Sequence, residues 1–124
     1  MKAQINLDAD DVIELIKAVL LRKDCRVTAD PILRGINSRN MRITVSFIQN
    51  GALSTTTLDK DELKNMIADD FRLRGYSVMR PFVDLLHGNR QSFPPGMVGA
   101  FCAIVNINLP YHLNYSEVNS GEIV

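Results

Sequence analysis

Two segments of the chain carry arginines that could bind an anion. The first holds Arg34, Arg39 and Arg42 with no acidic residue between them, and a guanidinium fork matches the oxygens of a phosphate group. The second, His87 to Met97, offers hydrogen-bond donors and an aromatic ring that could stack on a base. Such a site would bind a nucleotide or a strand of nucleic acid. The site that the two segments predict consists of Arg34, Arg39, Arg42, His87, Asn89, Arg90 and Phe93.

A second interpretation of the arginines needs no ligand. If the strand after each predicted helix returns alongside that helix, its hairpin ends near the helix start. Acidic residues cluster at both helix starts, around Asp8 and Asp59. Their carboxylates could pair with the loop arginines, or the arginines could be ordinary solvated side chains. The sequence leaves these interpretations open. A further place for a partner is the outward side of the predicted strands, at Thr44, Ser46, Asn106 and Asn108.

One carboxylate stands among apolar positions. Asp70 takes the place in the second predicted helix that Val19 takes in the first, and a carboxylate in apolar surroundings could serve as a general acid or base. We favour the alternative, in which Asp70 lies at the edge of the apolar stripe and faces solvent beside Asp69.

No sequence motif argues for catalysis or for a bound metal. The chain has no phosphate-binding loop, no GxSxG elbow and no HExxH motif. Its histidines are far apart in sequence, and Cys25 and Cys102 are isolated, which favours reduced thiols over a zinc site or a disulfide. The sequence therefore predicts a protein that is not an enzyme and that has neither a metal nor a cofactor.

The composition is that of one ordinary globular domain. The chain of 124 residues is 46% hydrophobic and balances 14 basic against 14 acidic side chains. No overall field therefore attracts it to nucleic acid or to an anionic membrane. No apolar run has the length of a signal peptide or of a membrane span. We expect a cytoplasmic protein without a membrane partner, in which any anion site depends on a local patch.

The elements that would position these residues occur twice. The pair Leu7-Asp8 recurs as Leu58-Asp59. Each half then has the pattern of a short strand, an acidic helix cap, an amphipathic helix, a stop at Asp24 or Gly75, an extended segment with a proline, and a strand of period two. The sequence predicts an α+β fold, a duplicated β-α-β-β unit whose mixed sheet is covered on one face by two helices.

These elements predict a single domain, 1–124, made of two repeats and a tail. The repeats span about 1–50 and 51–110, and the C-terminal tail spans 111–124. Free sheet edges need protection, and pairing them across a two-fold axis predicts a homodimer.

The N-terminal residues resemble the start of small phage and prophage proteins, in which a strand, an acidic cap and an amphipathic helix come first. The similarity is carried by the run MKAQINLDADDVIELI and by Val19 to Lys23, with their second copy. It implies an accessory or host-takeover protein that acts by binding, and it assigns no functional residue. Our leading prediction is a non-enzymatic binding protein whose partner is a host protein. The alternative is a nucleic-acid or nucleotide binder that uses the loop arginines.

Overall fold

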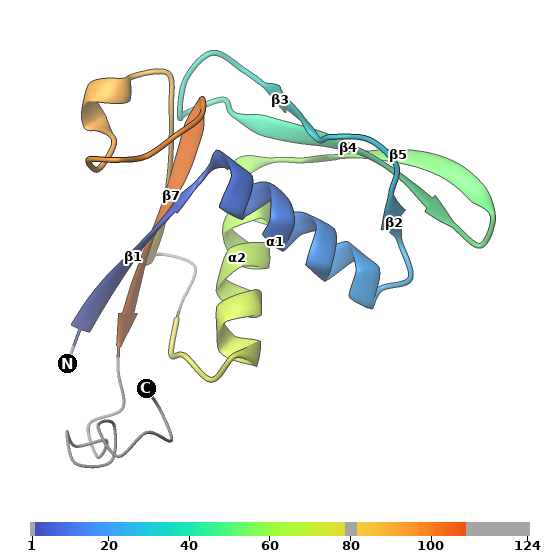
Figure 1. The fold of residues 1–124 in the computed structure, drawn as a ribbon, viewed down its shortest axis with the longest axis horizontal. Helices are drawn as coiled ribbons and strands as arrows, with labels where there is room; N and C mark the ends of the chain where they lie inside the picture. Colours follow the sequence, from blue (N-terminus) through green and yellow to red (C-terminus); the bar gives the residue numbers. More distant parts are fainter. Residues whose placement is uncertain (1, 79–81, 109–124) are drawn as a thin grey trace.

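The computed structural model describes residues 2–78 and 82–108, and Figure 1 shows their arrangement. The helices are α1 (Ala9–Arg22) and α2 (Lys60–Leu73), and a short 3₁₀ helix spans Arg90–Ser92. The predicted tail, 111–124, lies outside the described residues. The described strands are β1 (Lys2–Asp8), β2 (Arg26–Val27), β3 (Ile32–Arg34), β4 (Arg42–Gln49), β5 (Ala52–Leu58), β6 (Val83–His87) and β7 (Phe101–Asn108).

Both helices begin at the acidic caps that the sequence predicts. The Asp8 side chain accepts a hydrogen bond from the Asp11 N–H (3.1 Å), and the Asp11 side chain accepts one from the Asp8 N–H (3.1 Å). Asp59 and Glu62 form the same reciprocal pair at the start of α2. Each pair satisfies N–H groups that have no partner within the helix, and it places negative charge at the positive end of the helix dipole.

Both helices end in the same left-handed turn. Asp24 has a φ of 60° and Gly75 a φ of 94°. After Asp24, the Cys25 N–H donates to the carbonyl oxygen of Leu20 (2.9 Å), which is the pattern that closes a helix with a left-handed residue. The next described strand is β2 after α1 and β6 after α2.

The strands form two antiparallel sheets, so the prediction of one mixed sheet is wrong. Sheet A has the order β1-β7-β6, and in sheet B the strand β4 pairs with β5 on one side and with β2 and β3 on the other. The first strand of each half pairs with the last strand of the other half, β1 with β7 and β5 with β4. A hydrophobic pattern fixes the face that a residue takes but not the strand that lies beside it. The α+β class is confirmed, and the duplication stays a prediction.

Apolar residues stand side by side across each sheet. In sheet B, Ile43 is opposite both Leu33 of β3 and Leu58 of β5. The corresponding row of sheet A holds Leu85, Ala103 and Leu7. These rows point toward the helices and form the floor of the core.

The two sheets meet at an angle, and the helices fill the corner between them (Figure 1). Helix α1 contacts strands of both sheets, and so does α2. Ile16 of α1 and Ile67 of α2 are fully buried. Because both helices lie on the same side of sheet B, its other side has no described element over it.

Candidate functional site

The side of sheet B that faces away from the helices carries positive charge and no acidic residue. Residues that are opposite each other in an antiparallel pair share a face, and Ile43 and Val45 mark the buried one. The residues that alternate with Ile43 and Val45 along β4 therefore point outward. The residues of β2, β3 and β5 that pair with these outward residues share their face. We call this surface the open face, and it consists of Arg26, Ile32, Arg34, Arg42, Thr44, Ser46, Ile48, Leu53, Thr55 and Thr57.

Hydroxyl groups cross the middle of the open face. The Oγ1 atoms of Thr44 and Thr57 are 3.1 Å apart, and Ser46 Oγ lies 3.4 Å from Thr55 Oγ1. These contacts join β4 to β5 on the outer side and hold the hydroxyl rows in place. The open face therefore has hydroxyl groups across its middle and arginines at its ends.

Two arginines stand directly opposite each other at one end of the open face. Arg34 of β3 pairs in register with Arg42 of β4, and both are exposed. Like charges in this relation destabilise a sheet. Arg42 Nη1 donates to the carbonyl oxygen of Asn40 (3.2 Å), and Arg34 takes part in none of the ion pairs among the described residues. The pairing of Arg34 with Arg42 is thus unfavourable within the sheet itself.

The turn between these arginines holds Arg39. Asn40 Oδ1 accepts hydrogen bonds from the N–H groups of Ile36 (3.0 Å) and Asn37 (3.2 Å), and Asn37 Oδ1 accepts one from the Arg39 N–H (3.0 Å). Side chains that bond nearby backbone in this way fix a turn. The turn therefore has a defined shape at the end of the open face.

Beside the turn lies a hollow of about 390 Å³ that adjoins the start of α2. Arg39 and Arg42 line it together with Asp59, Lys60 and Asp61. The structure thus brings two of the three predicted arginines close to the acids of a helix start, as the second interpretation of the sequence expects. Arg34 does not line this hollow.

His87 connects the two predicted segments through the backbone. Its Nε2 lies 2.8 Å from the carbonyl oxygen of Gly35 and its Nδ1 lies 3.1 Å from that of Ala100. The His87 N–H also donates to Ser38 Oγ (2.8 Å). Both ring nitrogens therefore face protein acceptors, and the ring fastens β6 of sheet A to the turn of sheet B.

The remaining predicted site residues build the loop between β6 and β7. Arg90 donates to the carbonyl oxygens of Met97 (2.9 Å) and Gly99, and its guanidinium lies 5.2 Å from the centroid of the Phe93 ring. Phe93 is 9% exposed, and Asn89 Oδ1 accepts from the N–H of Gln91 (3.2 Å). The expectation of a Phe93 ring free to stack is therefore wrong, because the ring is buried and the guanidinium of Arg90 lies beside it.

A buried thiol lies near the same loop. Cys102 is fully buried. Its neighbours in β7, Phe101 and Ala103, face the core, so Cys102 lies on the other face of the strand. Burial raises the pKa of the Cys102 thiol from its ordinary value of 9.0, and the nearby charge of Arg90 lowers it in part. Arg90 of the loop between β6 and β7 is thus close enough for its charge to act on this thiol.

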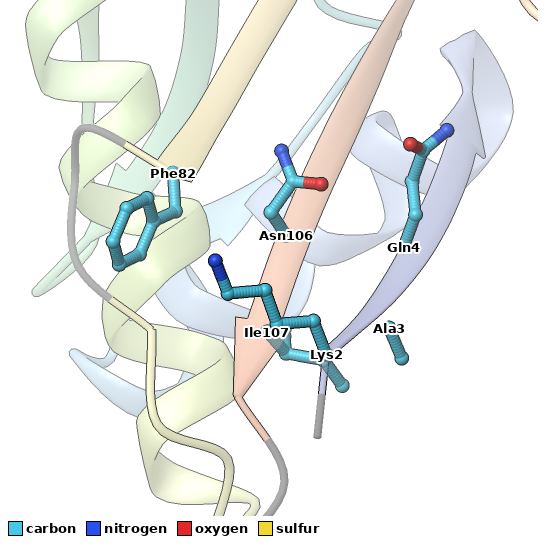
Figure 2. A pocket seen from close by; sticks show the side chains of 6 residues that line it. All are labelled: Lys2, Ala3, Gln4, Phe82, Asn106 and Ile107. Carbon is cyan, nitrogen blue, oxygen red and sulfur yellow. The ribbon is translucent and has the colours of Figure 1, made fainter.

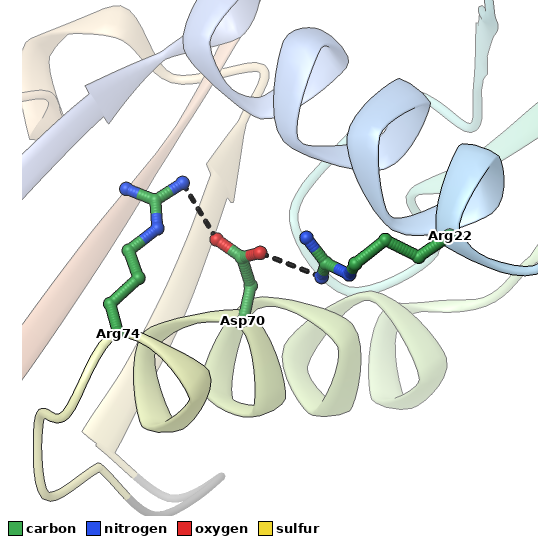
Figure 3. Close-up of polar contacts among 3 residues, drawn as sticks. All are labelled: Arg22, Asp70 and Arg74. Atoms are coloured by element: carbon green, nitrogen blue, oxygen red, sulfur yellow. Dashed lines mark hydrogen bonds and ion pairs between the residues drawn. The ribbon is translucent and has the colours of Figure 1, made fainter.

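Asp70 is 2% exposed, so the interpretation of a solvent-facing carboxylate is wrong. Figure 3 shows its carboxylate between two arginines. Oδ1 accepts a hydrogen bond from Nη2 of Arg22 (2.8 Å), and Oδ2 forms an ion pair with Nη2 of Arg74 (2.8 Å) that lacks the alignment of a hydrogen bond. These contacts tie the C-terminal end of α1 to that of α2 and give Asp70 a structural role.

Other parts of the described chain offer no comparable site. A hollow of about 410 Å³ lies at the far end of sheet A, where the Lys2 side chain reaches toward Phe82 (Figure 2). We assign no site there. Within 2–78 and 82–108, no group of three or more His, Cys, Asp or Glu side chains could hold a metal ion. None of the described helices has the length and apolar character to cross a membrane.

The open face adds residues that sequence reasoning missed. Thr44 and Ser46 were expected to point outward, but Arg26, Ile32 and Leu53 were not connected with them. The alternation along 42–49 and 52–58 could have indicated the outward set, but only the register joins the strands.

No protein-family model, curated protein or solved structure matches the chain. The resemblance to small phage proteins therefore stays a prediction from the N-terminal residues.

Proposed function

We propose that the protein is a non-enzymatic binding protein whose open face takes up an acidic surface of a partner protein. The observation that carries the proposal is the opposition of Arg34 and Arg42 on a face whose ten residues include no carboxylate. Asp59 and Asp61, at the margin of this face, share a hollow with Arg42 but not with Arg34. Natural sequences depart from local rules mainly at functional sites. An acidic partner would remove the repulsion between the two guanidiniums and accept hydrogen bonds from both.

The composition of the open face favours a protein over nucleic acid. Ile32 is 52% exposed and Leu53 is 71% exposed, and arginines near apolar groups are typical of protein interfaces. None of the ten residues of the open face is aromatic, so it has no platform on which bases of a single strand would stack. Nucleic acid stays the alternative, bound through its phosphates alone. The resemblance to phage proteins makes a host protein the expected partner.

Affinity capture with a charge-matched control tests this proposal. The variant Arg34→Ala/Arg42→Ala removes two positive charges from the open face, and Lys2→Ala/Lys23→Ala removes two exposed charges elsewhere. Each protein is used as bait in a cell lysate, with and without nuclease. We expect the wild type and the lysine variant to retain the same partner after nuclease. The arginine variant should lose it by about tenfold or more, which corresponds to about 1.4 kcal/mol.

Two outcomes would contradict the proposal. A partner that the arginine variant retains at the wild-type level would move the site away from the open face. Recovery that depends on intact nucleic acid would favour the alternative.

A further inference from the structure

We infer that the outer edge of β5 pairs with the same edge of a second copy of the chain, antiparallel and across a two-fold axis. Among the strands of residues 2–78 and 82–108, β5 has a neighbour, β4, on one side only. Its seven residues, ALSTTTL, include neither a charge nor a proline. Natural sheets protect free edges with charged residues, prolines, bulges or short strands. β5 has none of these protections, and the inference does not depend on the proposed function.

The other described sheet edges are protected. The edge formed by β2 and β3 is interrupted by a gap that contains Asp30 and Pro31. β1 carries Lys2 and Asp8 at its ends, and β6 carries the exposed Asp84 at its second position. A charge or a break thus stands on each of these edges. β5 differs from all of them.

The hairpin geometry shows which groups the edge offers. The β4–β5 hairpin has a two-residue turn, 50–51, with positive φ at both residues. In such a hairpin, hydrogen-bonded pairs alternate with non-bonded pairs, beginning with the bonded pair that flanks the turn. Leu53, Thr55 and Thr57 therefore turn their N–H and C=O groups away from β4. These groups have the spacing that an antiparallel strand requires.

The edge is complementary to itself. A two-fold axis at Thr55 places this residue opposite Thr55 of the second copy, and Leu53 opposite Thr57 of the second copy. Threonine pairs stabilise antiparallel strands, and the Leu53 side chain, 71% exposed, gains a neighbour. Arg42 lies beyond the row of Leu58, so the Arg34–Arg42 pairs of the two copies stand at opposite ends of the joined sheet. The two open faces then form one continuous surface.

The pairing also sets the strength of the dimer. Seven residues of edge contact bury less surface than the roughly 1,200 Å² of a standard stable interface. We therefore expect a dimer that dissociates in the micromolar range and whose population depends on concentration.

Sedimentation equilibrium of the full chain tests the inference. Thr55→Lys places two ammonium groups opposite each other on the two-fold axis. The backbone N–H and C=O of residue 55 do not bond to β4, so the substitution leaves the β4–β5 hydrogen bonds in place. Ala29→Lys adds the same charge in the gap of the opposite edge. We expect the wild type and Ala29→Lys to dimerise alike, and Thr55→Lys to raise the dimer dissociation constant by about tenfold or more. Circular dichroism checks that each variant is folded.

A wild-type protein that stays monomeric at high micromolar concentration overturns the inference and leaves the edge to a strand of another protein. Equal dimerisation of Thr55→Lys and the wild type would place the interface elsewhere. Cysteine cross-linking tests the register separately. Thr55→Cys should form a disulfide between subunits under mild oxidation, and Ala52→Cys should not, because residue 52 lies opposite residue 58 of the second copy. Equal cross-linking at both positions contradicts the proposed register.

Discussion

Removing both arginines that hold Asp70 should destabilise the protein more than removing Asp70 itself. The reason is the difference in exposure, because the Asp70 side chain is 2% exposed while those of Arg22 and Arg74 are 48% and 58% exposed. After Asp70→Ala, the two guanidiniums can turn to water. After Arg22→Ala/Arg74→Ala, the carboxylate stays between the helices without a cation.

The magnitudes follow from the same exposures. A buried charge that loses its partners costs about 3 to 5 kcal/mol, and this is the loss of unfolding free energy expected for Arg22→Ala/Arg74→Ala. Ion pairs of exposed side chains contribute only about 0 to 1 kcal/mol. Asp70→Ala is therefore expected to cost about 1 to 2 kcal/mol, mainly for the lost hydrogen bond. The triple variant should recover most of the loss of the double arginine variant.

Urea unfolding followed by circular dichroism measures these differences at neutral pH. Equal m-values across the variants show that one transition is compared throughout. The reasoning is refuted if Arg22→Ala/Arg74→Ala is no less stable than Asp70→Ala, or if the triple variant is less stable than the double arginine variant.

Four further predictions concern the core, the loop and the buried thiol. Ile67→Ala should cost about 2 to 5 kcal/mol in urea unfolding because the side chain is fully buried; a loss below about 0.5 kcal/mol would contradict its place under the sheets. Phe93→Ala should cost about 3 kcal/mol by the same assay, and a neutral result would mean that the loop does not pack on this ring. The Cys102 thiol should react with a disulfide reagent far more slowly in the folded protein than in urea, and equal rates would contradict its burial. Because burial raises the pKa of Cys102, its neutral thiol contributes stability that is present below pH 9.0 and lost as pH rises further, which urea unfolding at a series of pH values measures.

The helix ends were predictable because their signals are local. Asp8 and Asp59 each have the second acid of the pair three positions later, and Asp24 and Gly75 stand where a left-handed residue is needed. A cap depends on residues within one turn of the helix. The pairing of strands depends instead on residues far apart in the chain. No local signal therefore indicated that β1 pairs with β7 and β5 with β4.

The candidate site was predictable only in part, for the same reason. Arg34 and Arg42 were singled out for their charge, but their opposition across a sheet depends on the register of β3 with β4. Phe93 lies in a segment rich in Gly and Pro, which is typical of a surface loop, and only the structure shows its burial. The burial of Asp70 depends on Arg22 of the other helix.

Site-specific photo-cross-linking tests the central claim, that the open face binds a partner protein, most directly. A photo-reactive amino acid replaces Ile32, which is 52% exposed on the open face, and in a control it replaces Leu73, which is 72% exposed on α2. We predict a discrete protein adduct, stable to nuclease, from position 32 and not from position 73. Addition of Arg34→Ala/Arg42→Ala to the position 32 protein should abolish the adduct. Adducts of equal yield from both positions, or an adduct at position 32 that survives the loss of both arginines, would contradict the claim.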